Sequence, residues 1–112
     1  MSLTIALIEG QAPRQDGVEV YWRRLTHTCI GMAKAAGLYH PLWLPEAVGL
    51  EAAHQLIDPL ANGLDVLKAK PKYFRKLEAP IGQGTYDTFV PFVEQYLAAC
   101  HAHPEARIRV HH

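Results

Sequence analysis

Short apolar segments near the two ends of the chain have the pattern of β-strands. Residues 3–8 form an apolar run rich in β-forming side chains, which predicts a buried strand, and the glycine- and proline-containing segment 10–17 predicts the loop that ends it. Residues 106–110 alternate between apolar and basic side chains, as a half-exposed strand would. Since an isolated strand is unstable, we expect the two strands to pair with each other or with a second subunit.

Between these strands, residues 18–36 have an apolar period that fits a helix. At about 100° per residue, the apolar side chains that fall on one stripe are Val18, Trp22, Leu25, Cys29, Met32, Ala33 and Ala36. Gly37 follows as a natural C-terminal stop. The pattern therefore predicts a first helix over residues 18–36.

The middle of the chain carries a second apolar stripe behind a proline-bracketed connector. Residues 39–45 contain two prolines and are not expected to be helical throughout. Residues 50–69 repeat apolar side chains at helical spacing, and the stripe keeps its phase across Pro59. Asp58 and Pro59 would also suit the start of a new helix, so one kinked helix and two nearly coaxial helices both fit.

The last third of the chain predicts one further long helix. Residues 71–77 indicate a short helical turn, residues 78–86 a loop, and residues 88–102 a helix with Pro91 in its first turn, where the missing N–H has no partner. The whole chain, residues 1–112, is thus expected to be a single α+β domain. We expect it to be mostly helical, with about four helices and short N- and C-terminal strands.

The composition narrows the class of protein. The chain has 112 residues, 49% of them hydrophobic, with 11 basic and 11 acidic side chains, which excludes disorder and argues against a general nucleic-acid or membrane-surface binder. No apolar run reaches the roughly 18–20 residues of a membrane span, and the first residues lack the features of a signal peptide, so a cytoplasmic protein is expected. Cys29 and Cys100 lie in apolar patterns and are expected to be buried thiols.

The leading candidate site lies on the polar side of the first predicted helix. Arg23, His27 and Lys34 would share one face, with Gly31 between them. Two cations, an imidazole and exposed backbone can bind a phosphate or a carboxylate. The alternative is an ordinary solvated helix face, which is how most exposed arginines and lysines are used.

A glycine-containing loop and several aromatic side chains add weaker candidates. Gly82 and Gly84 would let backbone N–H groups approach a ligand, although a structural turn is the more common use of such a pair. Tyr39, Trp43 and Tyr86 could stack on a planar group, although aromatic residues in small helical proteins more often pack in the core.

The remaining chemistry argues against other functions. The basic run of Lys68, Lys70, Lys72, Arg75 and Lys76 is short, and the chain is neutral, so nucleic acid is not the expected partner. His101 and His103 have a poor spacing for a metal, and Ser2 is the sole serine. We therefore expect no metal, cofactor or catalytic residue. An enzyme that uses His27 as general base remains a third hypothesis.

Short motifs along most of the chain from Tyr21 onward resemble a family of small uncharacterised proteins of phages and bacterial genomes. The motifs are Thr26-His27, Met32-Ala33, Ala36-Gly37-Leu38-Tyr39, Leu42-Trp43, Pro45-Glu46, Asn62-Gly63-Leu64, Gly84-Thr85-Tyr86, Phe89-Val90-Pro91, Tyr96-Leu97-Ala98-Ala99-Cys100 and Pro104-Glu105-Ala106. Members often carry Asn-Gly-Trp-Gly where this chain has Ile81-Gly82-Gln83-Gly84, so two of the four side chains differ. The resemblance implies no activity, but it implies a phage-encoded or accessory setting.

Together these features predict a small cytoplasmic binding protein for an anionic metabolite or a nucleotide. The expected ligand-binding residues are Arg23, His27, Lys34, Tyr39, Trp43, Gly82, Gly84 and Tyr86. The alternative is a protein–protein interaction or inhibitor module, either homo-oligomeric or host-directed, with an exposed apolar patch around Trp43 and the connector 39–45.

Overall fold

The computed structural model describes residues 2–10, 17–78 and 84–112, and its centre is a three-stranded antiparallel sheet. The central strand β1 (Ser2–Glu9) pairs on one side with β2 (Val18–Thr26) and on the other with β3 (Arg107–His111). The two terminal strands therefore pair within one chain, which confirms one of the two expected arrangements. The protein is an α+β structure, as predicted.

The prediction of a first helix over residues 18–36 is wrong for about half of that segment. Residues 18–26 form β2, and only η1 (His27–Cys29) and α1 (Ile30–Ala35) are helical. The segment is rich in valine and aromatic side chains, which favour a strand. A β-bulge shifts the register between Leu7 and Ile8, so the alternation of side chains is interrupted and the period-two signal is lost.

The connector and the second stripe form helices of unequal length. α2 (Tyr39–Trp43) and η2 (Pro45–Val48) are separated by the non-helical Leu44, so residues 39–45 are not helical throughout, as predicted. α3 (Ala53–Ala69) runs unbroken through Pro59, which settles the open boundary in favour of one helix.

The C-terminal helices follow the prediction except at one boundary. α4 (Pro71–Arg75) is the expected short helix. α5 (Tyr86–Ala102) begins two residues earlier than residue 88, because Thr85 caps it. Pro91 consequently lies in the second turn and not, as predicted, in the first, so its missing N–H removes a helical hydrogen bond.

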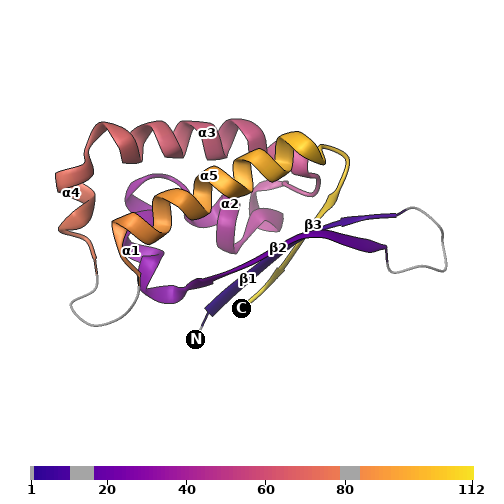
Figure 1. Cartoon of the computed structure of the whole chain (residues 1–112), viewed down its shortest axis with the longest axis horizontal. Coiled ribbons are helices and arrows are strands. Elements are labelled where there is room, and N and C mark those ends of the chain that lie inside the picture. Colours follow the sequence, from indigo (N-terminus) through magenta and orange to yellow (C-terminus); the bar gives the residue numbers. More distant parts are fainter. Residues whose placement is uncertain (1, 11–16, 79–83) are drawn as a thin grey trace.

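The helices cover one face of the sheet, with α3 and α5 side by side (Figure 1). Leu3, Ile5 and Leu7 of β1 point into this layer and are fully buried. The helices contribute fully buried side chains that include Leu56, Leu60, Phe89 and Tyr96. No element of the described ranges 2–10, 17–78 and 84–112 covers the opposite face of the sheet. Within the same ranges, none of the helices has both the length and the apolar character needed to cross a bilayer.

Candidate functional site

The predicted basic helix face does not exist, because its three residues lie on different elements. Arg23 is in β2, where its Nε donates to Gln95 Oε1 of α5 at 3.3 Å and its guanidinium lies 5.1 Å from the centre of the Tyr21 ring. His27 is in η1 and Lys34 in α1. The change from helix to strand at residues 18–26 separates Arg23 from the other two.

Four of the predicted residues nevertheless form a continuous packed series. The ring centres of His27 and Trp43 are 6.0 Å apart, those of Trp43 and Tyr39 are 5.7 Å apart, and Lys34 Nζ lies 5.0 Å from the centre of the Tyr39 ring. Trp43 is only 2% exposed. The series is therefore part of the core with a lysine at its outer end.

His27 lacks the surroundings that a general base needs. Its Nε2 is buried and has no hydrogen-bond partner in the described part of the chain. Burial raises the pKa of the nearby Cys29 thiol to about 11, so this thiol is not prepared as a nucleophile. The structure gives the enzyme hypothesis no support at this position.

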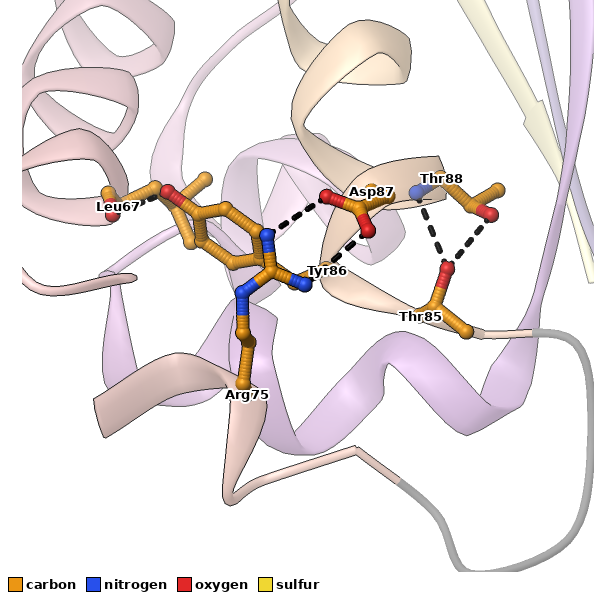
Figure 2. Close-up of polar contacts among 6 residues, drawn as sticks. All are labelled: Leu67, Arg75, Thr85, Tyr86, Asp87 and Thr88. Atoms are coloured by element: carbon orange, nitrogen blue, oxygen red, sulfur yellow. Dashed lines mark hydrogen bonds and ion pairs between the residues drawn. The ribbon is translucent and has the colours of Figure 1, made fainter. Parts of the chain in front are cut away.

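The described residues of the glycine loop have structural roles, and Gly82 lies outside the described ranges. Gly84 is buried against η1, where an added Cβ would lie 2.0 Å from Thr28 Oγ1. The Tyr86 hydroxyl donates to the carbonyl of Leu67 at 2.8 Å (Figure 2). Gly84 and Tyr86 thus hold the start of α5 against η1 and α3.

An ion pair completes this arrangement at the start of α5. The Arg75 guanidinium stands 4.8 Å from the centre of the Tyr86 ring and donates to both Asp87 oxygens, at 2.8 and 3.0 Å (Figure 2). The hydrogen bond from Arg75 lowers the pKa of the Asp87 carboxyl. Thr85 Oγ1 accepts from the Thr88 N–H at 3.2 Å and caps the helix. These polar groups form hydrogen bonds with one another, which leaves few of their donors and acceptors for a ligand.

The uncovered face of the sheet holds a set of side chains that the sequence prediction did not bring together. The register places Thr4, Ala6 and Ile8 of β1 on this face, because Leu3, Ile5 and Leu7 point to the helices. Their partners form three rows across the sheet: Arg24–Thr4–His111, Trp22–Ala6–Arg109 and Glu19–Ile8–Arg107.

Small residues in the middle of these rows create a trough. Thr4 and Ala6 stand between much larger side chains on β2 and β3, and the hollow between them has a volume of about 320 Å³. The residues that line it are Thr4, Ala6, Glu19, Trp22, Arg109, Val110 and His111. We call this hollow the sheet trough.

The sheet trough holds an exposed aromatic ring and lies on a face of the sheet with a positive formal charge. Trp22 is 45% exposed, and the Arg24 guanidinium lies 5.9 Å from its ring centre. Arg109 forms an ion pair with Glu19, with an Nη2–Oε2 distance of 3.1 Å. Three arginines against one glutamate on the three rows give this face a formal charge of +2 in a chain that is neutral as a whole.

The sequence contained part of this signal. The alternating arginines at 107 and 109 indicated a basic strand face, but Trp22 was assigned to an apolar helix stripe. Once residues 18–26 are placed in a strand, Trp22 and Arg24 point to the same face as Arg109.

Comparisons with known proteins add no relative: no protein-family model, no curated protein and no solved structure matches this chain. The resemblance suggested by the short motifs is therefore neither supported nor contradicted by them. Among the residues that the structure describes, no three histidine, cysteine, aspartate or glutamate side chains gather as ligands for a metal ion.

Proposed function

We propose that the protein binds a planar anionic small molecule, such as a nucleotide, in the sheet trough. The observation that carries the proposal is the exposed Trp22 ring beside arginines on both sides of a floor of small residues. The indole of Trp22 on the edge strand β2 is 45% exposed and leaves apolar area in water, which a stacked base would cover. The proposal keeps the predicted ligand class and replaces the predicted site.

Arg109 in the trough and Arg24 beside it suit a single phosphorylated group. Arg24 and Arg109 stand in neighbouring rows on β2 and β3, so a ring on Trp22 would have guanidinium groups on both sides. Guanidinium groups bind phosphate through paired N–H donors. Glu19 already contacts Arg109, and its free carboxylate oxygen could accept from a sugar hydroxyl.

The volume of the hollow favours a small molecule over a polymer. At about 320 Å³, the trough lies at the lower end of the range of roughly 300–1,000 Å³ that is usual for ligand pockets. The basic run on α4 is not continuous with it, because α4 lies on the helical side of the sheet (Figure 1). A cytoplasmic location and a phage-encoded setting are part of the same proposal.

Titration with adenosine 5′-monophosphate tests the proposal. Tryptophan fluorescence reports on the trough, because Trp43 is buried and Trp22 is exposed. We expect quenching by the monophosphate at lower concentration than by adenosine, and none by inorganic phosphate alone. Calorimetry should show that Trp22→Ala and Arg109→Ala each weaken binding about tenfold or more, as expected for loss of a stacking or charged contact.

The matched control is Tyr73→Ala. Tyr73 is 51% exposed, as an aromatic ring on α4 far from the trough, so its removal should leave the affinity unchanged. Equal effects of Trp22→Ala and Tyr73→Ala, or no binding by the wild type at millimolar ligand, would refute a nucleotide site on this face.

A further inference from the structure

The outer edge of β3 is only half covered by the rest of the chain. The Ile108 N–H donates to the carbonyl of Glu51 at 2.9 Å, and the Ala53 N–H donates to the carbonyl of Ala106 at 2.8 Å. Since backbone groups alternate in direction along a strand, Val110 presents its N–H and C=O to the same side as Ile108. No residue of the described ranges hydrogen-bonds to this part of the Val110 backbone.

An apolar groove lies directly beside this free backbone. It has a volume of about 400 Å³ between the end of β3 and η2. Its lining residues are Trp43, Leu44, Pro45, Glu46, Ala47, Val110 and His112. Leu44 is 36% exposed, and Val48 on the adjoining turn of η2 is 51% exposed. The groove is therefore bounded on one side by unpaired backbone and on the other by apolar side chains.

We infer that this edge docks an extended peptide segment of a partner protein, which adds a strand next to β3. Free N–H and C=O groups on a sheet edge recognise an extended backbone, and pockets beside the edge recognise alternate side chains. The Val110 side chain points toward the helices, opposite Ile5, so one set of the partner's side chains would enter the groove. The inference does not depend on a ligand in the sheet trough.

The charges of β3 determine which side chains of the partner strand are favoured on the uncovered face of the sheet. Arg109 and His111 point to the uncovered face and would lie opposite every second residue of an added strand. Acidic side chains complement Arg109 there, whereas Glu46 disfavours acidic side chains on the groove side. The partner segment is thus expected to alternate apolar and acidic residues.

The same charges argue against a second copy of this chain. An antiparallel pair centred on the unpaired Val110 would place Arg109 of each copy opposite His111 of the other, so that basic side chains face each other. Like charges directly opposite each other in a sheet are destabilising. A partner strand with acidic residues avoids this repulsion.

The test uses a capped nine-residue peptide that alternates valine and glutamate, and a matching peptide of valine and lysine. We expect the valine–glutamate peptide to shift the backbone amide signal of Val110 in ¹⁵N-labelled protein, and to bind at least tenfold more tightly than the valine–lysine peptide. Val110→Pro removes the outward N–H without removing a bond to β1, and should weaken binding about tenfold.

A second variant keeps the test decisive if the proline disturbs the sheet. Leu44→Asp places a charge in the groove and should abolish binding, whereas Val66→Asp, at a similarly exposed apolar position on α3, should not. No binding of either peptide, or equal binding by the Leu44→Asp and Val66→Asp proteins, overturns the inference. A wild-type dimer that Val110→Pro converts to a monomer also overturns it, because a second copy would then occupy the edge.

Discussion

Gly84 shows how a single residue can hold two parts of this structure together. It lies against η1 with no space for a side chain, because an added Cβ would be 2.0 Å from Thr28 Oγ1 and 3.0 Å from the Cys29 N atom. Gly84→Ala should therefore lower the free energy of unfolding by about 1–3 kcal/mol, as overpacking usually does. Urea denaturation followed by circular dichroism measures this change.

Gly31 provides the matched control. An added Cβ there meets only the Leu77 carbonyl oxygen, at an ordinary distance of 3.6 Å, and the residue lies in α1. Gly31→Ala should raise the free energy of unfolding by about 0.5–1 kcal/mol, since alanine is the better helix former. If both substitutions change the free energy of unfolding in the same direction, the close contact with Thr28 is not the reason that position 84 requires glycine.

The sequence could identify such residues but not their roles. Gly84 and Tyr86 stood out in the chain because glycines and aromatics in a loop are suited to ligands. Their actual neighbours, Thr28 for Gly84 and Leu67 for Tyr86, lie far away in the sequence. Only the fold shows that these contacts are internal.

At the level of elements, α3 contains a proline, Pro59, inside the helix, where it weakens the helical hydrogen bonding. Pro59 lies in the second turn of a helix that starts at Ala53, so it leaves the carbonyl of Gln55 without its helical N–H partner. Pro59→Ala should restore this hydrogen bond and raise the free energy of unfolding by about 1–3 kcal/mol. Thermal and urea denaturation both measure the gain.

Pro71 is the control for this prediction. It is the first residue of α4, where an N–H would have no helical partner. Pro71→Ala should therefore change the free energy of unfolding by only a few tenths of a kcal/mol. A gain at Pro71 equal to that at Pro59 would show that the restored helical hydrogen bond is not its source, since the greater freedom of the unfolded chain after loss of a proline acts in the opposite direction.

The elements also show where sequence periodicity succeeds. The stripe of α3 was visible because one face of a long helix packs on the core, with buried residues such as Leu56, Leu60 and Leu67 at helical spacing. The segment of β2 was misread because it is partly exposed on both sides and bulged, so its exposed residues follow no clean period of two. Pairing with β1, which is a tertiary contact, decides its structure.

At the scale of the whole molecule, the position of the helices determines what the sheet can do. All of them lie on one side, and the other face is left to side chains from β2, β1 and β3 (Figure 1). The strands that form the sheet trough come from both ends of the chain, so no local motif could reveal it. The fold class was predictable, and so was the need of each terminal strand for a partner, because an unpaired strand is unstable. The sequence left open whether that partner is the other terminal strand or a second subunit.

The core as a whole makes the stability of the protein sensitive to alkaline pH. Cys29 and Cys100 are both completely buried, and burial raises the pKa of the Cys29 thiol to about 11 and that of the Cys100 thiol to about 12. Both values lie above the ordinary thiol pKa of 9.0. Between pH 9 and these values, the unfolded chain releases protons that the folded chain retains.

The sign of the effect follows from this difference. Where the unfolded state binds fewer protons than the folded state, the free energy of unfolding falls as the pH rises. The folded state should therefore lose about 1 kcal/mol per thiol between pH 8.5 and 10, or about 2 kcal/mol for both. Urea denaturation in steps of half a pH unit measures the slope.

The thiols contribute most of the slope below pH 10, ahead of the other groups that titrate at high pH. Tyr96 and Tyr21 also have raised pKa values, because burial disfavours their charged forms, and the hydrogen bond to Glu94 raises the pKa of Lys68. The ordinary pKa values of these groups are 10.0 and 10.5, so their contribution begins only near pH 10. Cys100→Ala should reduce the slope between pH 8.5 and 9.5 by about half, even if the variant is less stable throughout. A wild-type stability that stays constant from pH 8.5 to 10, or native thiols that react with iodoacetamide as fast as unfolded ones, would mean that the thiols are not enclosed by the core.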